Sequence, residues 1–79
     1  MMKTNEALRR FRKERGLSQA DLCEVLQMKQ PQYSRYEVGL RDMKSEQIKT
    51  ICEHYNVSAD YLLGLTDEYK PFREMDAEE

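Results

Sequence analysis

The sequence predicts an all-α fold, a compact five-helix domain over residues 1–65 followed by an acidic extension or frayed tail over 66–79. Between Gly16 and Gly39 there is no other glycine and only one proline. Apolar residues there recur every three or four positions, which is the spacing of a helix rather than a strand. A chain of 79 residues has room for one modest core, because it buries only about 60% of its unfolded surface.

The first helix is predicted to begin near Thr4 or Asn5 and to end at Gly16, the residue type favoured just past a helix C-terminus. Leu8 and Phe11 fall on one face of this helix, since residues three apart are neighbours on a helical surface. We expect that face to point into the core.

The second helix is predicted to open with the segment 18–21, Ser-Gln-Ala-Asp. The serine hydroxyl and the aspartate carboxylate can each satisfy a free amide of the first turn, as in a capping box with the shorter acid. Leu22, Cys23 and Leu26 then point inward, and the helix ends near Gln27.

The third helix is predicted after a gap of only about three residues, running from Gln30 to Tyr36 or Glu37. Pro31 fits its first turn, where the missing amide would have had no partner. Gly39 closes the helix, and a loop over 38–43 leads onward.

The fourth helix is predicted over 45–55 and the fifth from Ser58 to Gly64. Asn56 is expected to cap the fourth helix in a left-handed conformation, and Ser58 to cap the start of the fifth. The inward stripe of the fourth helix consists of Ile48, Ile51, Cys52 and Tyr55.

The charge is unevenly distributed along the chain. The formal net charge is -2, yet residues 1–41 carry nine bases and five acids, whereas residues 42–79 carry four bases and ten acids. This asymmetry favours one face for a polyanion and a separate acidic tail. Ordinary solvated helix faces are the alternative explanation.

Several classes of protein are disfavoured. No run of about 18 apolar residues exists, and the N-terminus lacks an apolar signal stretch, so we expect a cytoplasmic protein with no membrane partner. Cys23 and Cys52 are expected to be reduced core residues. Cys52 and His54 alone do not predict a structural metal site, because no second pair of cysteine or histidine ligands lies nearby in the sequence. No phosphate loop, dinucleotide motif or catalytic constellation is present, so we expect no cofactor, no small-molecule substrate and no enzymatic activity.

The second and third helices form a predicted helix-turn-helix, whose second helix fits the DNA major groove. Tyr33 and Tyr36 are expected to anchor this helix, while its other face carries polar hydrogen-bonding groups. Glutamine suits adenine, arginine suits guanine, and serine pairs with either. The candidates for contacting bases are Gln30, Ser34 and Arg35. Pro31 either touches a thymine methyl or only starts the helix.

Contacts with phosphates are expected around this helix and at the start of the second helix, where free amides attract an anion. The candidates for contacting phosphates are Gln19, Lys29, Gln32 and Arg41. Arg9, Arg10 and Lys13 on the first helix are weaker candidates, because any solvated helix carries such residues.

Residues 4–65 resemble the Cro and phage-repressor type of helix-turn-helix domain, the xenobiotic-response-element-like family of bacterial and phage regulators. The segments that carry the resemblance are LRRFRKERGLSQADLCEVL, YSRYEVGLR and IKTICEHYNVSADYLLG. The resemblance implies a structural ion pair between Arg12 and Glu37 and supports roles in DNA binding for Gln19, Gln30, Ser34 and Arg35.

The sequence departs from the family pattern in three respects. Gln27 stands where the turn usually has glycine, and Lys29 stands where a polar cap is usual. Cys23 and Cys52 occupy positions that usually hold alanine.

The expected function is that of a sequence-specific regulator of transcription, a repressor that binds double-stranded DNA at a near-palindromic operator as a homodimer. A dimer surface could form from Tyr61, Leu65, Tyr69 and Phe72, unless these residues only cover the edge of the core. The alternative function is an antitoxin-like or adaptor module that grips a protein partner with its acidic C-terminal segment and binds DNA only secondarily.

Overall fold

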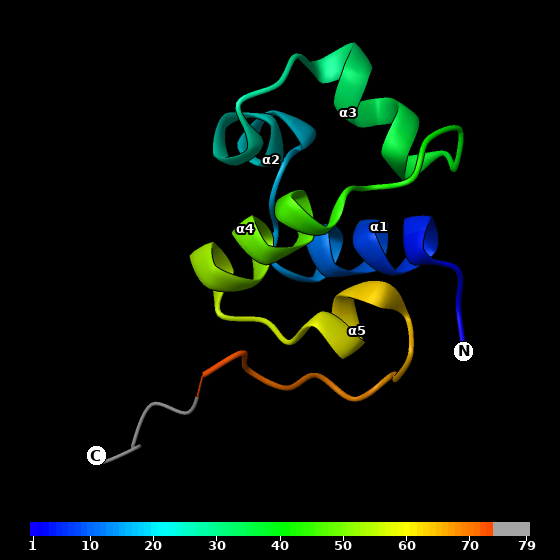
Figure 1. The fold of residues 1–79 in the computed structure, drawn as a ribbon, viewed down its shortest axis with the longest axis vertical. Helices are drawn as coiled ribbons and strands as arrows, with labels where there is room; N and C mark the ends of the chain where they lie inside the picture. Colours follow the sequence, from blue (N-terminus) through cyan, green and yellow to red (C-terminus); the bar gives the residue numbers. More distant parts are fainter. Residues whose placement is uncertain (74–79) are drawn as a thin grey trace.

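The computed structural model describes residues 1–73, which form five helices and no strand. The helices are α1 (Thr4–Glu14), α2 (Gln19–Leu26), α3 (Gln30–Glu37), α4 (Ser45–Tyr55) and α5 (Ala59–Leu63). Helices α2 and α3 lie together at one end of the domain and α5 lies at the other, with α1 and α4 between them (Figure 1). The all-helical fold predicted from the apolar spacing is therefore confirmed.

The helix ends follow the predicted chemistry. Ser18 Oγ accepts a hydrogen bond from the Asp21 amide at 3.1 Å, and Asp21 Oδ2 accepts one from the Ser18 amide at 2.8 Å. Ser58 Oγ caps α5 by accepting a hydrogen bond from the Tyr61 amide at 3.3 Å. These side chains satisfy amides that have no partner within the helix.

Two residues other than glycine adopt the left-handed conformation within the described part of the chain. They are Gln27 at φ 56° and Asn56 at φ 53°, each at the C-terminus of a helix. Lys29 occupies the N-cap position of α3, but its side chain makes no capping hydrogen bond. The left-handed conformation costs Gln27 about 1–2 kcal/mol, and α3 begins without a side-chain cap.

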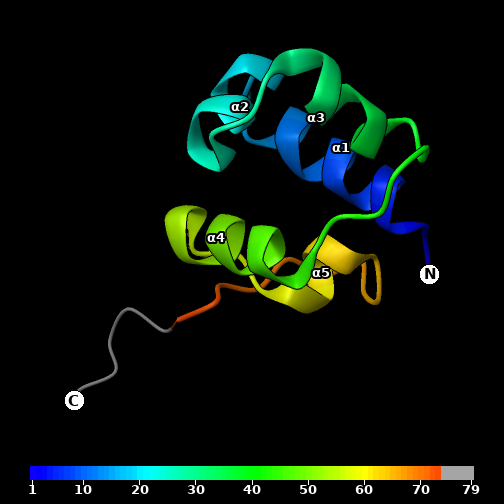
Figure 2. The same cartoon turned by 45° about the horizontal axis from the view of Figure 1, so that its top comes forward.

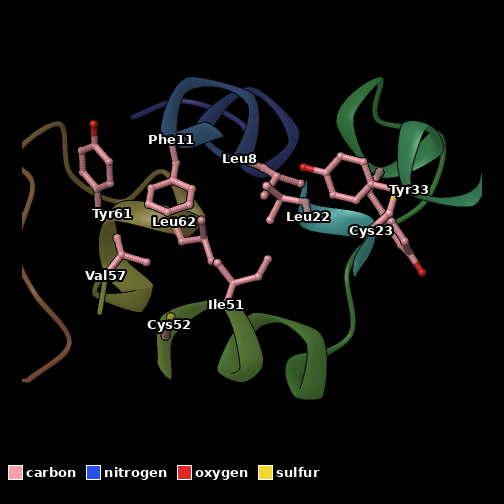
Figure 3. Close-up of a cluster of buried hydrophobic side chains, with 11 residues drawn as sticks. Leu8, Phe11, Leu22, Cys23, Tyr33, Ile51, Cys52, Val57, Tyr61 and Leu62 are labelled. Carbon is pink, nitrogen blue, oxygen red and sulfur yellow. The ribbon is translucent and has the colours of Figure 1, made fainter. Parts of the chain in front are cut away.

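The core extends along the length of the domain (Figure 3). Tyr33 lies beside Leu22 and Cys23 at one end, and Val57 and Tyr61 lie at the other. Cys23 and Cys52 are free and buried, as expected of packing residues, and burial raises the pKa of both thiols.

Residues 66–73 lie against the domain as an ordered extension, which we call the strap. The chain returns along α5 toward the end of α4 (Figure 2). The Ser58 amide donates to the Lys70 carbonyl at 2.8 Å, and the Asn56 side chain exchanges two hydrogen bonds with the backbone of Arg73. Residues 66–73 of the expected extension or tail therefore lie against the domain, and residues 74–79 lie outside the described part of the chain.

Tyr61 is a core residue, so its expected place on a dimer surface is wrong. Its side chain is only 3% exposed, since the Arg10 guanidinium lies 4.0 Å from its ring centroid and Tyr69 packs edge-on against it. Tyr61 instead covers the edge of the core, as the alternative interpretation expected. Leu65, Tyr69 and Phe72 remain about half exposed.

Candidate nucleic-acid interface

Helices α2 and α3 are joined by the turn 27–29 and stand side by side at one end of the domain (Figure 1). The Met28 amide donates to the Cys23 carbonyl at 3.0 Å, which closes the end of α2 as the chain leaves its left-handed Gln27. A short turn of this kind between two packed helices is the helix-turn-helix geometry.

Helix α3 has one buried face and one outward face, as predicted. Tyr33 and Tyr36 are buried, at 0% and 6% exposure. The Tyr36 hydroxyl accepts a hydrogen bond from Gln47 Nε2 at 3.3 Å, which ties α3 to α4. The outward residues are Gln30, Pro31, Gln32 and Arg35, which are exposed, and Ser34, which is half-buried.

Glu37 ends α3 as a buried carboxylate with four hydrogen-bond donors around it. The Arg12 guanidinium forms a bidentate ion pair with it, through Nε at 2.7 Å and Nη2 at 3.2 Å. Tyr33 Oη donates to Oε2 at 2.5 Å, and Gln19 Nε2 donates to Oε1 at 3.2 Å. The third nitrogen of Arg12 donates to the Leu17 carbonyl, so the guanidinium spans α1, the start of α2 and α3.

The electrostatics keep this cluster charged. Burial opposes ionisation of Glu37, but the hydrogen bonds from Arg12, Tyr33 and Gln19 outweigh it and hold the pKa of the carboxyl below its ordinary range. The hydrogen bond to Glu37 raises the pKa of Arg12 against the effect of its own burial. Burial, reinforced by Glu37, raises the pKa of the Tyr33 hydroxyl. Glu37 and Arg12 are therefore ionised and Tyr33 is neutral at pH 7.

Two glutamines connect this cluster to the outward face of α3. Gln30 Nε2 donates to Gln19 Oε1 at 3.3 Å, while Gln19 itself donates to Glu37. Sequence reasoning placed Gln19 and Gln30 in separate roles and treated Tyr33 only as an apolar anchor. The spacing of Tyr33 and Glu37, four residues apart on one helix face, was the available signal for their contact.

A second group of polar residues lies at the other end of the outward face. Gln32, Arg35 and Arg41 line a shallow pocket of about 170 Å³ together with Tyr36. The amides of Leu40 and Arg41 both donate to the Arg35 carbonyl, which folds the loop after α3 back toward the helix. Lys29 is exposed at the start of α3 and lines no part of this pocket.

The cations of this surface have no acidic partner within the described residues. Among residues 1–73 the ion pairs are Arg10 with Asp67 and Arg12 with Glu37. Lys29, Arg35 and Arg41 are exposed and belong to neither pair. Their charge is thus available to an external anion.

Helix α1 contributes fewer free cations than its composition suggests. Arg10 donates to Asp67 Oδ1 and to the carbonyls of Tyr61 and Thr66, so it anchors the strap and is not available for phosphate. Its place among the weaker phosphate candidates is therefore wrong, because its guanidinium is already used. Arg9 and Lys13 remain exposed.

Other kinds of site are not evident in the part of the chain that the structure describes. Over residues 1–73, no group of three or more His, Cys, Asp or Glu side chains could hold a metal ion. None of the helices described there is both long enough and apolar enough to cross a membrane.

Comparison with known proteins gives consistent matches. The family model described as helix-turn-helix matches residues 8–62. The HTH-type transcriptional regulator YobD of Bacillus subtilis is 32% identical over 84% of this chain and 59% of its own length. The HTH-type transcriptional regulator ImmR of the same organism is 33% identical over 95% of this chain and 58% of its own length.

A solved structure matches as well. The crystal structure of a transcriptional regulator from Listeria innocua superposes with a TM-score of 0.73 at 26% identity, covering 84% of this chain and 62% of that chain. The chain thus spans about three fifths of the length of these relatives.

Proposed function

Since the chain belongs to the helix-turn-helix family of the Cro and phage-repressor type, we propose that it is a sequence-specific regulator that represses transcription from a near-palindromic operator. The observation that carries the proposal is the outward face of α3. That face holds amide, hydroxyl and guanidinium groups, and its cations have no acidic partner among residues 1–73. Such groups match the hydrogen-bonding edges of bases in the major groove.

The proposed roles divide the surface into two sets. Gln30, Ser34 and Arg35 contact base edges, because they lie on the outward face of the helix that enters the groove. The phosphate-contacting set consists of Gln19, Lys29, Gln32 and Arg41. These residues lie beside the base-contacting set, and the N-terminus of α2 adds the positive end of its dipole.

The proposed assembly on DNA is a homodimer. Two copies would place their α3 helices in successive major grooves, about 34 Å apart, and so require an operator with two-fold symmetry. Leu65 and Phe72, which are 55% and 46% exposed, provide apolar surface for such a contact. Sedimentation of the protein with and without a selected operator measures the number of copies in the complex, and two copies per operator are expected.

The alternative of an adaptor that uses its acidic tail receives less support. Asp67, one of the acids of that segment, is paired with Arg10 of the same chain at 2.9 Å. This ion pair holds the strap against α1 of its own domain.

Two substitutions separate the proposed roles once selection from a random DNA pool has given a preferred sequence. Arg35→Ala should relax discrimination at one base position by about 1–3 kcal/mol, because one bidentate contact to guanine is lost. Arg41→Ala should weaken binding to all sequences alike. It should also reduce the slope of log affinity against log salt concentration by about one, because one phosphate contact is lost. Unchanged discrimination in Arg35→Ala would show that the base-contacting face is assigned wrongly.

A further inference from the structure

A cavity of about 430 Å³ lies between the N-terminus of α1, the loop after α3 and the end of α5. This volume is within the range of about 300–1,000 Å³ that is typical of small-molecule sites. The apolar side chains that line it are buried or half-buried, so they form its inner wall. They are Leu8, Tyr36, Met43, Ile48 and Leu63.

The rim of this cavity is charged. Lys3, Arg41 and Asp42 line it and are exposed. Neither Lys3 nor Arg41 belongs to an ion pair among residues 1–73. Two cations thus stand against one acid, so the rim favours an anion while the inner wall favours an apolar body. A small carboxylate with a short apolar tail meets both conditions.

Two polar side chains of the wall are already used by the fold. Thr4 Oγ1 donates to the Leu63 carbonyl at 3.2 Å, and Asn5 Nδ2 donates to the Glu37 carbonyl at 3.2 Å. These hydrogen bonds join the start of α1 to the ends of α5 and α3, which lie on two sides of the cavity. The wall is therefore braced without a ligand, and the two cations of the rim are the groups that would hold one.

Arg41 connects the cavity to the candidate DNA surface. It also lines the shallow pocket of about 170 Å³ beside Gln32 and Arg35, and Tyr36 lines both spaces. A guanidinium binds a carboxylate best through two parallel hydrogen bonds, and it binds a phosphate in the same way. Arg41 cannot make both bidentate contacts at once, so a carboxylate in the cavity competes with a DNA phosphate.

We propose that this cavity is an effector site for a small carboxylate with an apolar tail, and that the bound carboxylate withdraws Arg41 from DNA. The effect on DNA rests on the proposed function and deepens it, whereas binding of the carboxylate does not depend on that function. Because coupling between two sites is reciprocal, DNA weakens binding of the carboxylate by the same factor.

Binding is tested on the full chain with hexanoate and pentylamine, which share a pentyl chain and carry opposite charges. Methyl and amide NMR shifts follow each titration. We expect hexanoate to bind saturably and to shift the methyl groups of Met43, Ile48 and Leu63, because these line the inner wall. Pentylamine should not bind saturably, since the rim carries more cations than acids.

Lys3→Gln is the variant of the site, because Lys3 is an exposed residue of the rim and is not among the proposed DNA contacts. It should weaken hexanoate binding several-fold and leave operator affinity unchanged. Lys49→Gln is the matched control, since it removes the same charge from an exposed residue that does not line this cavity. It should leave hexanoate binding unchanged.

The coupling is tested by measuring operator affinity in saturating sodium hexanoate and in sodium chloride at the same concentration, which corrects for the effect of salt. Affinity should fall roughly fivefold or more in hexanoate, the lower range for coupled sites. Arg41→Ala should show no such fall, because the guanidinium that the carboxylate withdraws is absent.

Three results would overturn the inference while leaving the proposed function in place. The first is a hexanoate titration without saturation, or one that pentylamine reproduces. The second is saturable hexanoate binding with an unchanged operator affinity. The third is a loss of operator affinity that persists in Arg41→Ala. If the unmodified protein prefers no sequence at all, the proposed function fails and the effector role fails with it, while the NMR titration still decides whether the cavity binds a carboxylate.

Discussion

At the scale of single residues, Glu37 links the stability of the domain to its candidate interface. Its carboxylate joins α1, α2 and α3 through Arg12, Gln19 and Tyr33. The resemblance implied the contact with Arg12, but it said nothing about the hydrogen bonds from Tyr33 and Gln19. Those depend on side-chain rotamers and on the packing of three helices, which no sequence pattern specifies.

The lowered pKa of Glu37 predicts a specific pH dependence of stability. A carboxyl whose pKa is lower in the folded state stabilises the fold fully above its ordinary pKa of about 4.5, and this stabilisation is lost as the pH falls through the lowered folded value. Glu37→Gln leaves Arg12 without its charge partner and should reduce the free energy of unfolding at pH 7 by about 3 kcal/mol. The difference between the two proteins should shrink as the pH falls below about 4.5.

Denaturant unfolding at a series of pH values between 2 and 7 measures this difference. Glu24→Gln is the control, because Glu24 is exposed and belongs to neither of the ion pairs among residues 1–73. A difference that stays constant with pH would contradict the assignment of an ionised, hydrogen-bonded Glu37.

At the scale of elements, the turn between α2 and α3 and the strap after α5 differ in how well the sequence predicted them. Apolar spacing, capping residues and turn residues located all five helices within a few residues, because these signals are local. The strap depends on contacts between distant segments, such as Arg10 with Thr66 and Asn56 with Arg73. An acidic composition with one proline contains no information about those contacts.

The left-handed turn residue gives a prediction about stability. Gln27 has φ 56°, a conformation that costs a side-chain-bearing residue about 1–2 kcal/mol and costs glycine nothing. Gln27→Gly should therefore raise the free energy of unfolding by about 1 kcal/mol after the larger entropy of unfolded glycine is subtracted. In a domain of this size that corresponds to a rise in Tm of roughly 4–8 °C.

Thermal unfolding of Gln27→Gly and Gln27→Ala checks the conformational origin of the gain. Alanine shortens the side chain but keeps the Cβ atom, so it should give no comparable increase. Equal effects of the two substitutions would show that backbone strain at this position is not the cause.

At the scale of the whole molecule, the structure divides the basic residues of the N-terminal half into two groups. Three arginines of the basic half, Arg10, Arg12 and Arg15, hydrogen-bond to other parts of the same chain. The cations without an acidic partner among residues 1–73 include Lys29, Arg35 and Arg41, which lie on or beside α3. Composition predicted a basic face, but only the structure separates the cations that hold the fold from those without an acidic partner among residues 1–73.

The central claim is that this face binds DNA through phosphates and selects a sequence through bases. The most direct test is a binding titration with the selected operator at salt concentrations from about 50 to 200 mM, alone and with random competitor DNA. With two charged phosphate contacts, Lys29 and Arg41, in each protomer of a dimer, affinity should fall roughly a hundredfold over that range. The operator should remain bound at least about a thousandfold more tightly than the competitor at one salt concentration. An affinity that hardly changes with salt, or that is equal for the operator and the competitor, would contradict the account.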